Sequence, residues 1–182
     1  MARRPLILSR TVPATVAAVL AAMPVTSASA AATRIRAEGP LTAYSASIPA
    51  GATARVQAVA TGSGRTVVTL HVWGLVPHNA YGAHAHVNAC GATGAAAGPH
   101  YQDRRAPAGH LADIAFANPD NEIWLDLTTD ADGNGAAQTV VDWQFRADGA
   151  NSVVVHAQPT AAGPDGSAGT AGSRLACLSV DF

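Results

Sequence analysis

The sequence predicts an all-β fold, and three observations support this prediction. Short runs in which apolar and polar residues alternate with a period of two recur between clusters of Gly, Pro, Asn and Asp. No stretch shows sustained helical periodicity. The chain has 182 residues, 48% of them hydrophobic and 13% charged, which suits one globular domain. Eight short strands of this kind are typical of a Greek-key sandwich or flattened barrel.

The expected strands occupy residues 41–48, 55–60, 66–73, 81–86, 122–129, 136–145, 152–156 and 175–180. In the fifth, the apolar residues Ile123, Leu125 and Leu127 alternate with other types, which predicts a strand with one buried face. Two long segments rich in Gly, Ala and Pro remain, at residues 88–120 and 157–173, and both are bounded by histidines. Loops of this length in a compact domain are usually functional or disordered.

The first thirty residues have the features of a secretory signal peptide. Arginines precede a largely apolar run at residues 11–25, and small residues at 28–30 offer a cleavage site. A membrane anchor is the alternative, but the run is shorter than the ~18 to 20 apolar residues that a span needs. Because Arg3 and Arg4 weakly resemble a twin-arginine signal, the export route stays open. We therefore expect residues 31–40 to be a flexible segment and 41–182 to be the domain, secreted or in the cell envelope, with no membrane span.

Charge and cysteine content narrow the class of protein. All 11 basic residues are arginine and the formal net charge is -1, so no basic field exists to hold a nucleic acid. The two cysteines, Cys90 and Cys177, lack the CxxC spacing of a zinc or redox motif. In the oxidising compartment that a signal peptide implies, a disulfide is favoured over two buried free thiols.

Histidine is the residue type that indicates chemistry. His84 and His86 lie two apart in an expected strand, so both imidazoles project from one face and could bind one ion. Taken alone, this pair could equally be two surface histidines. His100 in the first long loop and His156 at the end of an apolar strand could complete a site of four imidazoles. Such a donor set suits copper(II), with zinc as the competitor.

In their order along the chain, these residues resemble the copper/zinc superoxide dismutase family. The resemblance rests on residues 81–86 with Cys90, on 98–100, on 154–156 and on the Gly-Thr-Ala-Gly-Ser-Arg-Leu-Ala-Cys block at 169–177. It implies an eight-stranded Greek-key barrel with four copper ligands, His84, His86, His100 and His156. It also implies that Cys90 and Cys177 form a disulfide. Arg174 would attract and orient superoxide beside the copper, a role that suits a permanent planar cation.

The chain departs from the family at the zinc site. In the family, the histidine that corresponds to His100 bridges copper to a zinc ion held by two more His and an Asp. Here the following loop offers only His110 as a further imidazole, with Asp113 at the family's spacing from it. In a second alignment, which we prefer, Glu122 falls close to the position of the zinc-ligand Asp and His110 is incidental.

A carboxylate could therefore take the place of zinc. Glu122 or Asp113 could accept a hydrogen bond from the second nitrogen of His100. Asp126 could orient a metal-binding residue without itself contacting the metal. The loop at 157–173 contains a single acid and no lysine, so the charged loop that guides substrate in the family is reduced. These features resemble the copper-only branch, and the chain would be a divergent exported bacterial member. His71 and His78 match no family ligand and are expected to be structural.

The resemblance implies an exported copper-dependent superoxide dismutase. It would convert superoxide to oxygen and hydrogen peroxide by alternating copper(II) and copper(I), with Arg174 and His100 as the residues that act on substrate and proton. We expect copper and no zinc. The alternative is a non-catalytic module that stores or delivers copper on the same fold, although a store needs no substrate guide such as Arg174. A purely structural domain is a third possibility. The sequence leaves the oligomeric state open.

Overall fold

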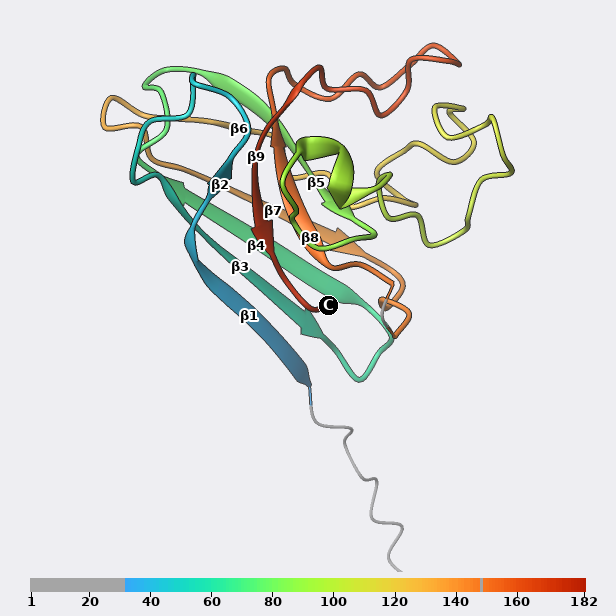
Figure 1. Cartoon of the computed structure of the whole chain (residues 1–182). Helices are drawn as coiled ribbons and strands as arrows, with labels where there is room; N and C mark the ends of the chain where they lie inside the picture. Colours follow the sequence, from blue (N-terminus) through green and yellow to red (C-terminus); the bar gives the residue numbers. More distant parts are fainter. Residues whose placement is uncertain (1–31, 148) are drawn as a thin grey trace, which may run out of the picture.

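Two antiparallel β-sheets packed face to face make up the fold (Figure 1). The computed structural model describes residues 32–147 and 149–182. One sheet has the order β1-β3-β4-β7, formed by Thr33–Pro40 (β1), Thr53–Ala60 (β3), Thr66–Trp73 (β4) and Gly135–Val141 (β7). The other has the order β2-β9-β8-β5-β6, formed by Thr42–Ala43 (β2), Arg174–Ser179 (β9), Ser152–His156 (β8), Ala80–His86 (β5) and Leu127–Thr128 (β6). The expected all-β Greek-key sandwich is confirmed.

The core lies between the two sheets. Inward residues of β3 and β4 are buried and alternate with partly buried ones, as the period-two pattern predicts. All residues of β8 are buried, because this strand is central in the second sheet and both of its faces are covered. Side chains from both sheets join in one apolar cluster that includes Val56, Leu70 and Val153.

The first strand begins earlier than the sequence predicts. Thr33–Pro40 falls in the segment expected to be flexible, yet it pairs with β3 along its whole length. Within residues 41–48, only Thr42–Ala43 forms a strand. The sequence pattern of β1 is weak because its less exposed face carries Ile35, Ala37 and Gly39, of which only Ile35 is a large apolar residue. Glu38 holds β1 to β3 from outside, accepting hydrogen bonds from Nε and Nη2 of Arg55 at 2.8 and 3.0 Å.

The expected fifth and sixth strands are shorter than predicted. In residues 122–129, only Leu127–Thr128 forms a strand, while the preceding residues make isolated bridges to His84 and Gln102. The predicted alternation nevertheless holds, since the apolar members of this segment are buried in the core. The strand expected at 136–145 ends at Val141, which pairs with Thr66, the first residue of β4. Because β4 begins at Thr66, it has no residue to pair with those that follow Val141.

Both long loops lie at the same region of the sandwich and contact each other. The amide of Gly166 donates to the carbonyl of Ala112 at 2.9 Å, and the amide of Ile114 donates to Oδ1 of Asp165 at 2.8 Å. These bonds join the 88–120 loop to the 157–173 loop. Both loops contribute residues to the same cavity, which is described below.

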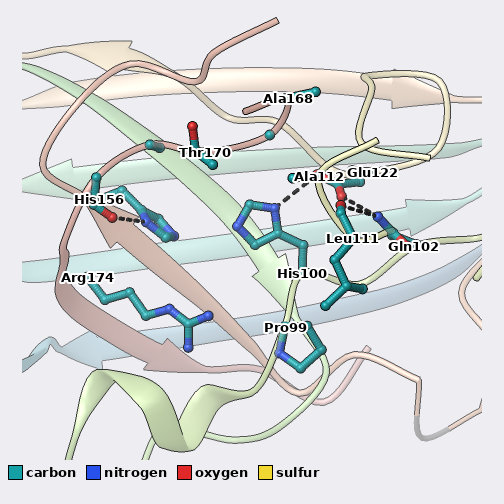
Figure 2. A pocket seen from close by; sticks show the side chains of 13 residues that line it. Pro99, His100, Gln102, Leu111, Ala112, Glu122, His156, Ala168, Thr170 and Arg174 are labelled. Carbon is teal, nitrogen blue, oxygen red and sulfur yellow. Dashed lines mark hydrogen bonds and ion pairs between the residues drawn. The ribbon is translucent and has the colours of Figure 1, made fainter. Parts of the chain in front are cut away.

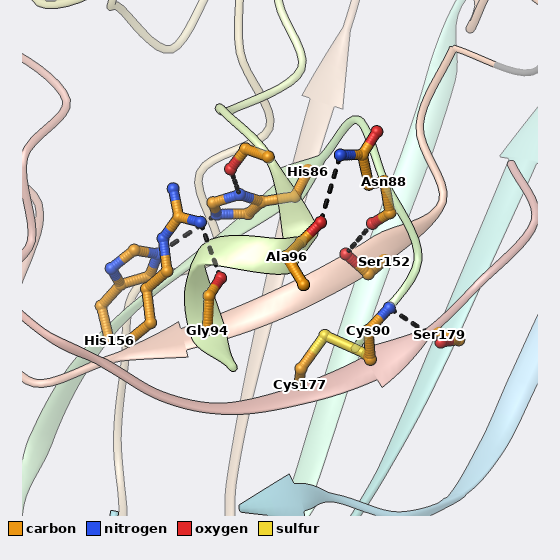
Figure 3. Close-up of a disulfide and its surroundings, with 11 residues drawn as sticks. His86, Asn88, Cys90, Gly94, Ala96, Ser152, His156, Cys177 and Ser179 are labelled. Carbon is orange, nitrogen blue, oxygen red and sulfur yellow. Dashed lines mark hydrogen bonds between the residues drawn. A yellow bond between two sulfur atoms is a disulfide. The ribbon is translucent and has the colours of Figure 1, made fainter. Parts of the chain in front are cut away.

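A disulfide anchors the start of the first loop to the second sheet. Cys90, which follows β5, is bonded to Cys177 on β9, with 5.8 Å between the Cα atoms (Figure 3). The predicted pairing is therefore present. The short 3-10 helix η1, Gly94–Ala97, follows directly and packs against β8 and β9.

The predicted signal peptide, residues 1–30, lies outside the described residues. Within the part of the chain that the structure describes, no helix has the length and apolar character to cross a membrane.

Candidate metal centre

Four histidines from β5, β8 and the first long loop converge on the second sheet. His84 and His86 project from the same face of β5, as their spacing predicts, and His156 ends the neighbouring strand β8. His100 reaches the site from the first loop through an isolated bridge to His86. One ring nitrogen from each histidine lies within 4.8 Å of the others. We call these residues the histidine cluster: His84, His86, His100 and His156.

Each imidazole in the histidine cluster is held through its second nitrogen. Nδ1 of His86 contacts the carbonyl of Gly98 at 2.9 Å, and Nδ1 of His156 contacts the carbonyl of Gly172 at 3.4 Å. Because a carbonyl only accepts, both Nδ1 atoms carry the proton and both Nε2 atoms present lone pairs. This second contact fixes the tautomer and ring orientation that a metal ligand needs.

The geometry of these free nitrogens fits a cation. Nε2 of His86 and Nε2 of His156 lie 3.3 Å apart, and in the tautomers just assigned neither has a proton to donate to the other. Nδ1 of His84 is buried and has no hydrogen-bond partner among the described residues. Buried polar atoms are rarely left unpaired, so facing lone pairs and an orphaned nitrogen are what a ligand set without its ion presents. An all-imidazole donor set suits copper(II) and also zinc.

Burial keeps these imidazoles neutral. It lowers the pKa of His86 to about 2 and that of His156 to about 4, with the charge of His100 as a further cause. Burial also lowers the pKa of His84 well below 6.5. A neutral imidazole is the form that binds a metal, so at neutral pH these groups need lose no proton before they bind.

Glu122 is the carboxylate that contacts His100. Its Oε2 accepts a hydrogen bond from Nδ1 of His100 at 3.0 Å and another from Nε1 of Trp124 at 2.8 Å. Its Oε1 accepts one from Nε2 of Gln102 at 2.8 Å. Glu122 is only 1% exposed, so the carboxylate is fixed by three donors in a buried setting. The orientation leaves Nε2 of His100 facing the rest of the histidine cluster.

Asp126 acts on the histidine cluster through another residue. Thr160 in the second loop donates from its hydroxyl to Oδ1 of Asp126 at 2.5 Å, and its amide donates to Oδ2 at 2.7 Å. Because the single hydroxyl proton goes to Asp126, the Thr160 oxygen must accept from Nε2 of His84, 2.7 Å away. This chain of contacts assigns the proton of His84 to Nε2 and leaves Nδ1 free.

A cavity of about 260 Å³ opens beside the histidine cluster (Figure 2). His100 and His156 line it, and Arg174 at the start of β9 lies across from Leu111 of the first loop. Nη1 of Arg174 donates to the carbonyl of Gly94 in η1 at 2.7 Å. This bond holds the guanidinium of Arg174 at the cavity that it lines.

Other predicted residues lie outside the histidine cluster. His110 and Asp113 contact each other at 3.6 Å, and His110 has a 58% exposed side chain. Asp113 therefore does not hold His100, and the second alignment, through Glu122, is the one that matches the geometry. His71 stacks on Trp73 at 5.9 Å between ring centroids, a contact away from the histidine cluster.

Two residues of the site escape sequence reasoning. Thr160 and Gln102 are of types that occur throughout surface loops, and neither belongs to a motif. Thr160 lies four residues after His156. The one indication in the sequence is that both residues lie inside the long loops, which are bounded by histidines.

Comparisons with known proteins agree with the fold and identify the family. The model of the copper/zinc superoxide dismutase family matches residues 51–180, which is more than half of the chain. The protein therefore belongs to the copper/zinc superoxide dismutase family, as the resemblance indicated.

Two solved structures have the same fold. The Cu/Zn superoxide dismutase from Brucella abortus aligns with a TM-score of 0.56 and 20% identity over 84% of this chain and 100% of that one. The clock protein EA4 aligns with a TM-score of 0.54 and 17% identity over 82% of this chain and 92% of that one. At these identities the likeness concerns the fold.

Proposed function

We propose that this protein is an exported copper-dependent superoxide dismutase. The observation that carries the proposal is the convergence of four imidazoles whose second nitrogens are each held by a separate partner. The histidine cluster would hold copper through Nδ1 of His84 and Nε2 of the other three. Bound copper would supply the alternating one-electron chemistry that converts superoxide to oxygen and hydrogen peroxide.

Arg174 would attract and orient the substrate. Superoxide is an anion, and a guanidinium keeps its charge at any relevant pH. The described 157–173 loop supplies one acid, Asp165, whose Oδ1 is already bonded to the amide of Ile114. Arg174 is the one guanidinium among the described residues that line the cavity. Steering by one nearby cation depends on ionic strength.

Glu122 would take the place of zinc. In a two-metal member of the family, the second nitrogen of the bridging histidine binds zinc, whereas Nδ1 of His100 contacts Glu122. Both oxygens of this carboxylate are already occupied by donors, and His110 and Asp113 lie elsewhere. These contacts support a copper-only centre. His100 remains the candidate proton carrier, because its Nδ1 keeps a fixed acceptor while its Nε2 faces the cavity side.

The disulfide supports the export part of the proposal, since such bonds persist mainly in oxidising compartments. Sequencing the N-terminus of protein recovered from the culture medium or cell envelope tests it. A mature chain that begins near residue 31 is expected, whereas intact residues 1–30 on exported protein would contradict cleavage there.

Metal content and superoxide dismutation should be measured on one sample of mature protein expressed with copper and zinc both supplied. One copper, no zinc and fast dismutation are expected. Bound copper without dismutation would favour the storage or delivery module, and stoichiometric zinc would contradict the copper-only centre. Protein that takes up no copper would overturn both functions.

The steering role needs a matched pair of variants. Arg174→Ala should slow dismutation and flatten its dependence on ionic strength, because the cation nearest the site is lost. Arg65→Ala removes the same charge from a residue that pairs with Asp142 outside the site, and should behave nearly as the wild type. Equal effects of both substitutions would mean that only the net charge matters.

A further inference from the structure

The cavity beside the histidine cluster is much larger than a diatomic substrate requires. Its volume is about 260 Å³, whereas one water molecule occupies roughly 30 Å³ in the liquid. It falls just below the roughly 300 Å³ at which pockets for drug-sized ligands begin. The space therefore matches a compact organic molecule of about ten non-hydrogen atoms.

The walls of this cavity are mostly apolar. Side chains without polar atoms come from both long loops: Pro99, Leu111, Ala112, Ala168 and Ala171. Leu111 is 51% exposed, so much of its apolar surface is in contact with water. A ligand that covered Leu111 would remove this apolar surface from water and gain binding free energy in proportion to the area buried.

The charged end of the cavity selects an anion. Within residues 32–147 and 149–182, the side chain of Arg174 makes one hydrogen bond, to Gly94, so further guanidinium donors remain for a ligand. Glu122 also lines the cavity, where it accepts hydrogen bonds from His100, Gln102 and Trp124, and Figure 2 shows it on the side away from Arg174. Figure 2 shows Arg174 and Leu111 on opposite sides, with Pro99 between them.

We propose that this cavity binds a small monocarboxylic acid with a flat apolar body, of about the size of benzoate. The carboxylate would lie on Arg174, where a planar fork of donors matches two oxygens. The apolar body would lie over Pro99 against Leu111. Such an acid would cover the approach to the histidine cluster and exclude other anions from Arg174. This binding uses residues of the chain and does not depend on whether the protein turns over superoxide.

The test is calorimetric titration of the copper-loaded protein with benzoate, acetate and benzyl alcohol. Acetate carries the same carboxylate, so any direct bond to the metal is common to both acids and cancels in their ratio. Benzyl alcohol carries the ring without the charge. We expect benzoate to bind at least about tenfold more tightly than either probe, because only benzoate uses both ends of the cavity. Equal affinity for benzoate and acetate would overturn the proposal.

Two substitutions in the 88–120 loop distinguish the effect of the cavity wall on benzoate affinity from the effect of removing any exposed apolar side chain. Leu111→Ser removes an apolar side chain that lines the cavity, whereas Ile114→Ser removes one of similar exposure, 49%, that does not. Leu111→Ser should weaken benzoate about tenfold and leave acetate unchanged, and Ile114→Ser should alter neither. A loss of the same size in both variants would contradict binding in the cavity.

Arg174→Gln completes the set, and it should bring benzoate down to the affinity of benzyl alcohol. Benzoate affinity that survives this change would overturn the role of the guanidinium. Leu111→Ala serves as a milder variant of the wall, with thermal unfolding as the check that each protein is folded. Since heat of binding is measured rather than turnover, a protein without dismutase activity still gives a clear result.

Discussion

At the residue scale, the chemistry of the site depends on which group accepts a hydrogen bond from the second nitrogen of each imidazole. His86 and His156 are held by backbone carbonyls, His100 by a buried carboxylate and His84 by a hydroxyl. A carboxylate acceptor makes an imidazole more electron-rich than a carbonyl does. The four nitrogens are therefore unequal donors, and the two side-chain partners, Glu122 and Thr160, are the ones that substitution can test.

Glu122→Gln should weaken copper binding about 10- to 100-fold, the usual cost of losing a partner behind a metal ligand. The amide has one acceptor oxygen, so it cannot serve His100 and Gln102 together. Competition with a copper chelator measures the affinity. Asp113→Asn removes the same charge from a residue outside the histidine cluster and should leave the affinity unchanged. If Glu122→Gln binds copper as the wild type does, the carboxylate has no positioning role.

Thr160→Val should also weaken copper binding, by about tenfold or more, because Nε2 of His84 loses its acceptor and Asp126 loses a donor. Thr160→Ser keeps the hydroxyl and should restore the wild-type affinity. The copper electron paramagnetic resonance spectrum should change in the valine variant and not in the serine variant. Identical spectra in all three proteins would rule out Thr160 as the residue that orients His84.

At the scale of elements, strand geometry supplies the ligands and loops supply their supports. β5 presents two imidazoles on one face, and β8 adds a third at its end. The disulfide fixes the loop that carries η1, whose Gly94 carbonyl in turn positions Arg174. Figure 3 shows Gly94 on the same short segment that begins at Cys90. The disulfide is thus linked to the substrate entrance as well as to stability.

Replacing both cysteines by serine should lower the free energy of unfolding by about 2 to 5 kcal/mol, as is usual for a native disulfide that closes a long loop. Guanidinium unfolding of the metal-free protein measures this, because a reductant would also reduce and bind copper. The wild type unfolded in the presence of reductant is the matched control and should show the same loss. An unchanged midpoint in the double variant would contradict a stabilising role.

At the scale of the whole molecule, folding buries several imidazoles that the unfolded chain exposes. Their pKa values fall from 6.5 to about 2 for His86 and about 4 for His156. Between these values and 6.5, the unfolded chain takes up protons that the folded protein excludes. Stability is therefore complete above pH 6.5 and is lost as the pH falls toward 4.

The metal-free protein should accordingly lose about 2 to 3 kcal/mol of stability for each of these two histidines between pH 7 and pH 4.5, at about 1.4 kcal/mol for each pH unit below 6.5. Thermal unfolding across this range measures the effect. His86→Gln should reduce the slope, because the variant has one titrating group fewer. A melting temperature that did not change with pH would show that the histidine cluster is open to protons in the folded state.

Local periodicity in the sequence determined the class of fold and the placement of His84 and His86, while the full set of four candidate ligands came from the family resemblance. The spacing of His84 and His86 places both on one strand face wherever that strand lies. Alternation likewise located most of the strands, including Thr66–Trp73 and Ser152–His156 with their observed bounds. β1 was missed because its inward residues are mostly small and its stability comes from pairing with β3, which no local pattern reveals.

Only the tertiary structure decided which groups support the ligands. Glu122 and Asp113 were both candidates in the sequence, and packing placed Glu122, 22 residues from His100 in the chain, against its ring. Thr160 lies 76 residues from His84 and carries no motif. These hydrogen-bond partners come from segments that are far apart in the sequence and meet only in the folded protein. Sequence periodicity indicates only which face of an element is buried. Strand periodicity therefore predicted that two histidines share one face of a strand, and tertiary contacts set the tautomers of the imidazoles.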